Sequence, residues 1–112
     1  MIRVTWFASG DSQRAFVCAG HSGYAQEGED IVCAAVSALT VNCVNALESV
    51  AHVRPDVKKG QGFLAVRLPK DCESRDAQVL LLSLKQGLRD ICAQYPAYIR
   101  LKTMAQSERR QQ

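Results

Sequence analysis

The sequence has no Cys-x-x-Cys pair, although five of its 112 residues are cysteines. They are Cys18, Cys33, Cys43, Cys72 and Cys92. An odd number of cysteines without regular spacing does not fit the disulfide framework of a small secreted domain, so we expect reduced, intracellular thiols. A strand pattern begins directly after Met1, which leaves no room for the basic and apolar regions of a secretory signal. Both observations predict a cytoplasmic protein.

The sequence also lacks a strong charge of either sign. Its formal net charge is +3, and the basic residues are scattered apart from Lys58-Lys59 and Arg109-Arg110. The basic stripe that is typical of nucleic-acid-binding proteins is therefore missing. We expect no direct nucleic-acid partner.

No charged residue occurs from Ile31 to Leu47. A membrane-spanning helix needs ~20 predominantly apolar residues. This stretch is shorter, and it contains polar side chains such as Ser37 and Thr40. We therefore predict a buried core helix and no membrane partner.

Patterns that would indicate a metal or a phosphate ligand are missing as well. The histidines and cysteines form no closely spaced pair of the kind that holds zinc, so we expect no metal and no other cofactor. Three glycines precede the first helix, as in some phosphate-binding loops. The same stretch contains Glu27, Glu29 and Asp30, which would repel phosphate, and no lysine that could bind phosphate follows it. The same acidic residues favour a positively charged substrate, or they form a solvated loop that complements the helix dipole.

The pattern of apolar residues predicts an α+β fold, in which a mixed β-sheet packs against two amphipathic helices in the order β-β-α-β-β-α-β. We expect strands at residues 2–7 and 14–19, a helix from Asp30 to about His52, strands at residues 56–59 and 63–68, a helix that begins between Asp71 and Ser74 and ends before Pro96, and a strand at residues 97–104. Residues 1–106 should form one domain, and residues 107–112 a frayed tail.

Each predicted helix carries one apolar stripe at spacings of three and four residues. The first stripe consists of Val32, Val36, Leu39, Cys43, Leu47 and Val50. The second consists of Ala77, Leu80, Leu81, Leu84, Leu88, Ile91, Cys92 and Tyr95. The two helices would cover one or both faces of the sheet.

Among the five cysteines, Cys33 has the position that favours a catalytic role. It lies in the first turn of a predicted helix, where the positive end of the helix dipole favours the thiolate. We expect the Asp30 carboxylate to cap this helix at the N–H of Val32 or Cys33. His21 lies twelve residues upstream and could act as its base, while backbone N–H groups at the helix start, including that of Cys33, could stabilise an oxyanion. The spacing alone leaves open the alternative that Cys33 is a small buried apolar side chain, as expected for the other four cysteines.

The sequence resembles the ribosomal-processing cysteine protease family, called Prp, in two blocks. These are GHSGYA from Gly20 to Ala25 and GEDIVCAAVSAL from Gly28 to Leu39. Weaker similarity continues in the strand beginning Gly62-Phe63-Leu64, in the helix from Leu80 to Leu88 and in YPAYI from Tyr95 to Ile99, so that it covers nearly the whole chain.

The resemblance implies a His-Cys dyad protease that removes an N-terminal extension from the bacterial large-subunit ribosomal protein L twenty-seven. It implies that Cys33 is the nucleophile and His21 its base, that Asp30 and Ser37 have supporting roles, and that the protein is a homodimer. The implied substrate loop includes Gly20, Ser22, Gly23, Tyr24, Glu27, Gly28 and Glu29. We interpret this loop as a gate that closes on a basic peptide.

One alternative function stays open at this point. The chain could be a non-enzymatic, ribosome-associated or protein-binding module whose acidic loop docks a basic partner. The two hypotheses differ in whether a peptide bond of the partner is cut.

Overall fold

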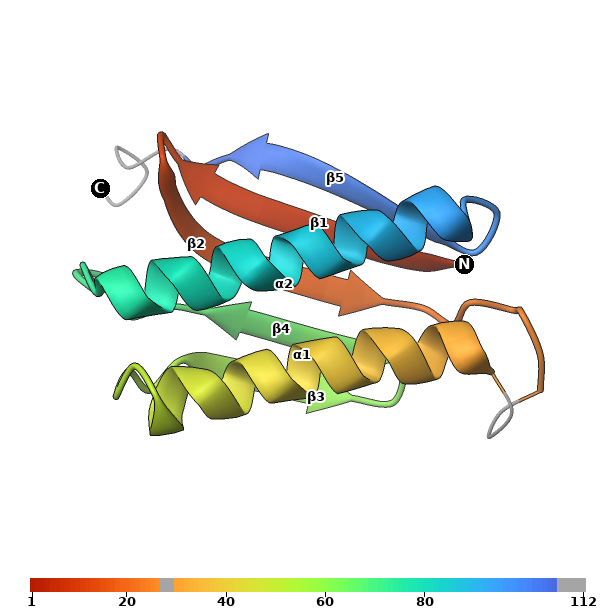
Figure 1. Ribbon diagram of the computed structural model, residues 1–112, viewed down its shortest axis with the longest axis horizontal. Helices are drawn as coiled ribbons and strands as arrows, with labels where there is room; N and C mark the ends of the chain where they lie inside the picture. Colours follow the sequence, from red (N-terminus) through yellow and green to blue (C-terminus); the bar gives the residue numbers. More distant parts are fainter. Residues whose placement is uncertain (27–29, 107–112) are drawn as a thin grey trace.

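The computed structural model describes residues 1–26 and 30–106. Its elements follow the predicted order (Figure 1): β1 Ile2–Ser9, β2 Ser12–Ala19, α1 Ile31–Ser49, β3 Asp56–Gly60, β4 Phe63–Arg67, α2 Arg75–Gln94 and β5 Ile99–Ala105. The predicted tail at residues 107–112 lies outside the described part of the chain. The α+β fold with a mixed sheet is confirmed.

The five strands form one sheet in the order β3-β4-β2-β1-β5. The pairs β1–β2, β2–β4 and β3–β4 are antiparallel, whereas β5 runs parallel to β1. A parallel pair needs a crossover connection, and α2 provides part of it. Both helices lie on the same face of the sheet and run in opposite directions (Figure 1). The sequence left open whether they cover one face or both, and the structure has them on one.

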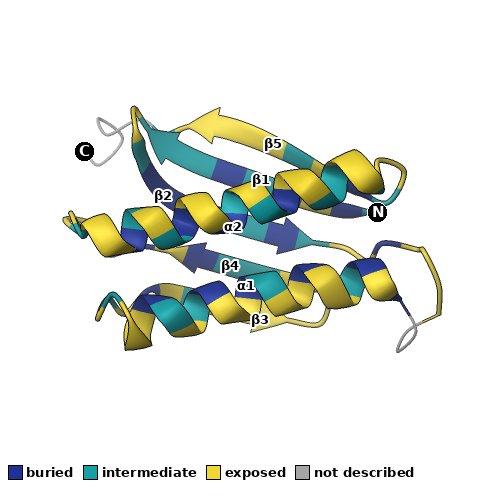
Figure 2. Cartoon of the chain, viewed as in Figure 1, coloured by how far each residue is buried: buried dark blue, intermediate teal, exposed yellow. Residues whose placement is uncertain are grey.

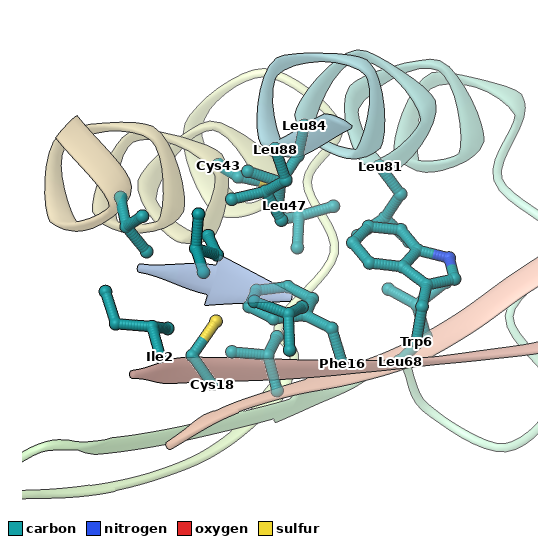
Figure 3. Packing of buried hydrophobic residues seen from close by; sticks show 14 of the residues in the cluster. Ile2, Trp6, Phe16, Cys18, Cys43, Leu47, Leu68, Leu81, Leu84 and Leu88 are labelled. Atoms are coloured by element: carbon teal, nitrogen blue, oxygen red, sulfur yellow. The ribbon is translucent and has the colours of Figure 1, made fainter. Parts of the chain in front are cut away.

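The core fills the layer between the helices and the sheet (Figures 2 and 3). As the alternation in the first strand predicts, Ile2, Val4 and Trp6 are buried. The indole ring of Trp6 stacks on Phe16, its neighbour on β2, with ring centroids 5.4 Å apart. The indole N–H donates to the Gln13 side-chain oxygen at 2.7 Å, so the buried polar atom has a partner.

The stripe predicted on α1 is correct at most positions and wrong at its end. Val32, Val36, Cys43 and Leu47 are buried and Leu39 is half-buried, but Val50 is 56% exposed. The reason is that α1 ends at Ser49, before the predicted end at His52. His52 adopts a left-handed conformation with φ 57°, and the Val53 N–H donates back to the Leu47 carbonyl at 2.8 Å.

Thr40 is buried on α1, although the sequence stripe omits it. Its hydroxyl donates to the Val36 carbonyl at 2.9 Å, which satisfies the polar group inside the core. By length and composition alone α1 could cross a membrane, a test that core helices of soluble proteins also pass. Here one side of α1 packs into the core.

The stripe predicted on α2 is confirmed. Ala77, Leu81, Leu84 and Leu88 are buried, and Leu80, Ile91, Cys92 and Tyr95 are half-buried. The helix begins at Arg75, one residue after the predicted range, because Ser74 is its N-cap and accepts a hydrogen bond from the Ala77 N–H at 3.0 Å.

We expect Leu88→Ala to lower the free energy of unfolding by about 2–5 kcal/mol, because removing a fully buried leucine leaves a cavity. Leu82→Ala is the matched control on the same helix. Leu82 is 48% exposed, so its loss should cost about 0.5 kcal/mol or less. Urea denaturation followed by circular dichroism measures both values. Equal losses would contradict the packing described above.

Candidate functional site

Three segments of the chain meet at one end of the molecule (Figure 1). They are the end of β2 with His21, the start of α1 with Cys33, and the turn between β3 and β4. The Gly20 N–H donates to the Gly62 carbonyl at 2.9 Å, which ties the end of β2 to the turn. The site therefore combines residues of the Gly20–Leu39 region with residues of the second hairpin.

Gly20 has no space for a side chain. Its φ of +97° is unfavourable for other residues, and an added Cβ would collide with the carbonyl oxygen of Met1. At Gly20, where the chain leaves β2, the backbone therefore lies in close contact with Met1, just before β1. This contact fixes where His21 leaves the sheet.

The Cys33 side chain lies in the first turn of α1 and is half-buried. Its Sγ accepts a hydrogen bond from the Ser22 N–H at 3.4 Å. A donor of this kind stabilises a thiolate more than a thiol. The sequence expectation of a partly accessible thiol at a helix start is therefore correct in its geometry.

Three other cysteines have environments that disfavour the thiolate. Burial raises the pKa of Cys18 to about 12 and that of Cys43 to about 11. Burial also raises the pKa of Cys92. These thiols fit the structural role that the sequence analysis assigned to them.

Asp30 is the N-cap of α1, as the sequence predicts. One carboxylate oxygen accepts from the backbone N–H groups of Val32 at 3.0 Å and Cys33 at 2.9 Å, and the other accepts from the Ser22 hydroxyl. Burial acts to raise the pKa of Asp30, but hydrogen bonds from Ser22, Cys33 and Ala25 outweigh it and lower the pKa to about 2. Asp30 is thus a carboxylate at neutral pH.

This cap corrects one sequence expectation. The N–H of Cys33 donates to Asp30, and the N–H of Ala34 donates to the Asp30 carbonyl at 3.0 Å. Because the N-cap residue takes these donors, the Cys33 N–H is not free to bind an oxyanion. A donor for that role has to be a group other than the Cys33 N–H.

The first half of the expected substrate loop is anchored to the body of the protein. The Ser22 side chain is buried, and its oxygen accepts from the Tyr24 N–H at 3.0 Å. The Tyr24 ring makes edge contacts with Tyr95 and Tyr98, with centroids 5.8 and 5.2 Å apart. Sequence reasoning placed Tyr95 in a core stripe and missed this contact. Residues 27–29 of the loop lie outside the described residues.

Two neighbouring cavities open at the site, and His21, Cys33 and Ser37 line both of them. One has a volume of about 520 Å³ and reaches Gly23 and Asp30. The structure thus brings together the predicted residues His21, Cys33, Asp30 and Ser37. No hydrogen bond between His21 and Cys33 is recorded within the described residues.

The other cavity has a volume of about 340 Å³ and extends to the second hairpin. Lys59 and Phe63 line it opposite Val36 and Val41 of α1. Sequence reasoning did not assign these residues to the site. The one signal that could have found them is the weak family similarity that begins at Gly62.

A metal centre has no support in the described part of the chain. Within residues 1–26 and 30–106, no three side chains of His, Cys, Asp or Glu lie close enough to hold a metal ion. Of the side chains that line both cavities, the Cys33 thiol can form a covalent bond with a substrate and the His21 imidazole can transfer a proton.

A thiol at a helix start that shares a cavity with a histidine is the arrangement of a thiol-dependent hydrolase. The family model described as cysteine protease Prp matches residues 1–100. The ribosomal processing cysteine protease Prp of Bacillus subtilis is 32% identical over 94 residues, which cover 80% of this chain and 84% of that relative. The chain belongs to the Prp family and is a cysteine protease.

Solved structures agree with this assignment. An essential ribosomal processing protease Prp from S. aureus, in complex with a covalently linked product peptide, superposes with a TM-score of 0.88 at 29% identity. The same protease in complex with a substrate peptide gives a TM-score of 0.82 at 28% identity. Each comparison covers 93% of this chain and 100% of the other.

We expect Asp30→Ala to lower the free energy of unfolding by about 1–2 kcal/mol at neutral pH, because α1 loses its N-cap. The folded pKa of about 2 lies below the ordinary value of 3.8. The contribution of the carboxylate is therefore present above about pH 4 and is lost as the pH falls toward 2. Denaturant titrations of both proteins from pH 7 to pH 2 measure this convergence.

Asp76→Ala is the control for removing a carboxylate. Asp76 lies exposed in the first turn of α2, so its loss should cost only a few tenths of a kcal/mol. A difference between wild type and Asp30→Ala that persists unchanged at pH 2 would contradict the charged cap.

Proposed function

We propose that this protein removes an N-terminal extension from a ribosomal protein, the large-subunit protein L twenty-seven, with His21 and Cys33 as its catalytic dyad. The observation that carries the proposal is that His21, in the loop after β2, and Cys33, in α1, line the same two cavities. The names of the relatives, which are ribosomal processing proteases, supply the substrate class.

In this proposal the Cys33 thiol transfers its proton to His21, and the thiolate attacks the carbonyl carbon of the scissile peptide bond. The bond to nitrogen breaks, His21 returns the proton to the leaving amine, and an acyl-enzyme remains on Cys33. A water molecule, deprotonated by His21, then hydrolyses the thioester and releases the thiol.

The oxyanion that forms beside Cys33 needs a hydrogen-bond donor. The Cys33 N–H is held by the Asp30 carboxylate, which keeps its charge throughout the reaction. We assign the role to the Ser22 N–H, which donates to Sγ at 3.4 Å and can turn to the oxyanion once the negative charge has moved from sulfur to the carbonyl oxygen. Asp30 supports the site indirectly, since its carboxylate holds both the Ser22 hydroxyl and the start of α1. Ser37 supports it from the next turn of the helix, where it lines both cavities.

The walls of the smaller cavity favour an apolar side chain next to the scissile bond. Val36, Val41 and Phe63 contribute apolar surface, and Lys59 adds a positive charge at the edge. The Asp30 carboxylate is engaged by the helix cap. A preference for a basic peptide therefore rests on Glu27 and Glu29, which lie outside the described residues.

The dyad predicts a sharp outcome for single substitutions. Cys33→Ala and His21→Ala should each lower the rate of cleavage at least about a thousandfold, because members of a catalytic unit are individually essential. The measurement is mass spectrometry of the extended ribosomal protein after incubation under reducing conditions. Cys92→Ala, which removes a half-buried thiol from α2, is the matched control and should leave cleavage unchanged.

The same experiment tests the alternative function. If the wild-type protein binds the extended substrate but its mass stays unchanged, the chain acts as a binding module and the proposed activity fails for this substrate. If cleavage persists in Cys33→Ala, the substrate assignment holds and the dyad is wrong.

We also propose that the protein works as a homodimer in the cytoplasm, without a nucleic-acid or membrane partner. The outer side of α1 supports a contact between two copies, because from Ile31 to Leu47 it carries no charge that the contact would bury. The exposed residues at helical spacing are Ile31, Ala35, Ala38, Asn42 and Asn45.

Ala38→Glu should convert the homodimer to a monomer, because two copies would bring two carboxylates into one uncharged contact. Sedimentation velocity at micromolar concentration measures the mass. Ala93→Glu introduces the same charge at an exposed position of α2 and should leave the dimer intact. A dimer that survives Ala38→Glu unchanged would place the contact on another face.

A further inference from the structure

We propose that Gly62 is a positioning residue for His21: the absence of a side chain at Gly62 leaves the space that the imidazole ring occupies. The inference deepens the proposed function, because it rests on His21 acting as the base of Cys33. It adds that catalysis requires a residue without a side chain in the β3–β4 turn, which is distant in the sequence from both members of the dyad.

There is no room for a side chain between Gly62 and the imidazole of His21. A Cβ built on Gly62 would lie 2.8 Å from Nε2 and 3.1 Å from Cε1 of His21. Non-bonded heavy atoms are at their optimal separation at about 3.5–4.0 Å. An alanine at position 62 and the imidazole in its present place therefore exclude each other.

The turn is fixed to the sheet, whereas the ring is free to move. The Gly62 carbonyl accepts from the Gly20 N–H at 2.9 Å, and the next residue, Phe63, pairs with Ala19 of β2. His21 is exposed, and a different rotamer would carry its ring away from the turn. A collision at Gly62 would therefore displace the imidazole rather than the backbone.

Displacement of the ring matters because proton transfer between Cys33 and His21 depends on the distance between the thiol and the imidazole. His21 lies in the loop after β2 and Cys33 in α1, and their side chains share both cavities, so a shift of the ring changes its separation from the thiol. A misplacement of a catalytic group by about 1 Å can cost about a hundredfold in rate. The substrate-binding walls would stay in place.

The first test compares Gly62→Ala with Gly10→Ala. Gly10 has nearly the same backbone conformation, with φ +60° against +66° at Gly62, but nothing lies within 4 Å of its added Cβ. Both variants carry the strain of a left-handed alanine, and only one contacts His21. Thermal unfolding of the two variants is the control, and we expect both to be folded and similarly destabilised.

We expect Gly62→Ala to lower the kcat for cleavage of the extended ribosomal protein about a hundredfold with KM changed less than about threefold. Gly10→Ala should keep the wild-type kcat. Equal kcat values for the two variants, or a loss in Gly62→Ala that appears only in KM, would overturn the inference.

The second test reads the thiol directly and needs no cleavage. The rate of Cys33 alkylation by iodoacetamide, followed by mass spectrometry of the Cys33 peptide, is measured against pH in wild type, Gly62→Ala, His21→Ala and the double variant. If Gly62 acts through His21, Gly62→Ala shifts the pH profile toward that of His21→Ala and adds nothing in the double variant.

The outcomes separate the two proposals. If His21→Ala leaves both cleavage and the alkylation profile unchanged, the dyad itself fails. If His21→Ala changes both but Gly62→Ala changes neither, the dyad stands and the positioning role of Gly62 is wrong. If Gly62→Ala has the same effect with and without His21, Gly62 acts directly on Cys33 or the backbone, which also overturns the inference.

Discussion

The Asp30 carboxylate is the interaction on which the rest of the site depends. It caps α1 through the N–H groups of Val32 and Cys33, and it holds the loop through the Ser22 hydroxyl. Ser22 in turn directs its own N–H to Cys33 Sγ. One buried charge thus fixes the helix start, the loop that precedes it and the donor that faces the thiol. Because these bonds share one anion, losing it would disturb all of them together.

The cap also changes how the helix start can contribute to chemistry. A free helix N-terminus offers its N–H groups to an anionic ligand. Here Asp30 takes those of Val32 and Cys33, so these two N–H groups are not available to an anionic ligand. The Ser22 N–H is supplied by the loop instead, and that loop is anchored by Tyr24 on Tyr95 and Tyr98.

Local pattern was enough to predict the order of elements, the core stripes and the cap, because each depends on residues close in sequence. Errors occur where a distant contact or a chain reversal decides the outcome. Apolar spacing that continues to Val50 predicts an end of α1 near His52, but the helix ends at Ser49 and the chain turns away through the left-handed His52. The sequence allows the Cys33 N–H either to cap onto Asp30 or to bind an oxyanion, and the geometry assigns it to Asp30.

The same limit explains why the sequence does not predict the wall of the site that the β3–β4 turn contributes. His21 and Cys33 belong to one contiguous signature, but the opposite wall comes from the β3–β4 turn, with Lys59 and Phe63 beside Gly62. This turn reaches His21 only because β4 pairs with β2 and the Gly20 N–H binds the Gly62 carbonyl. The sheet is therefore more than a support for the helices. Its strand order brings Gly62 next to the imidazole of His21, and the fold thereby determines the position of this base relative to the Cys33 thiol.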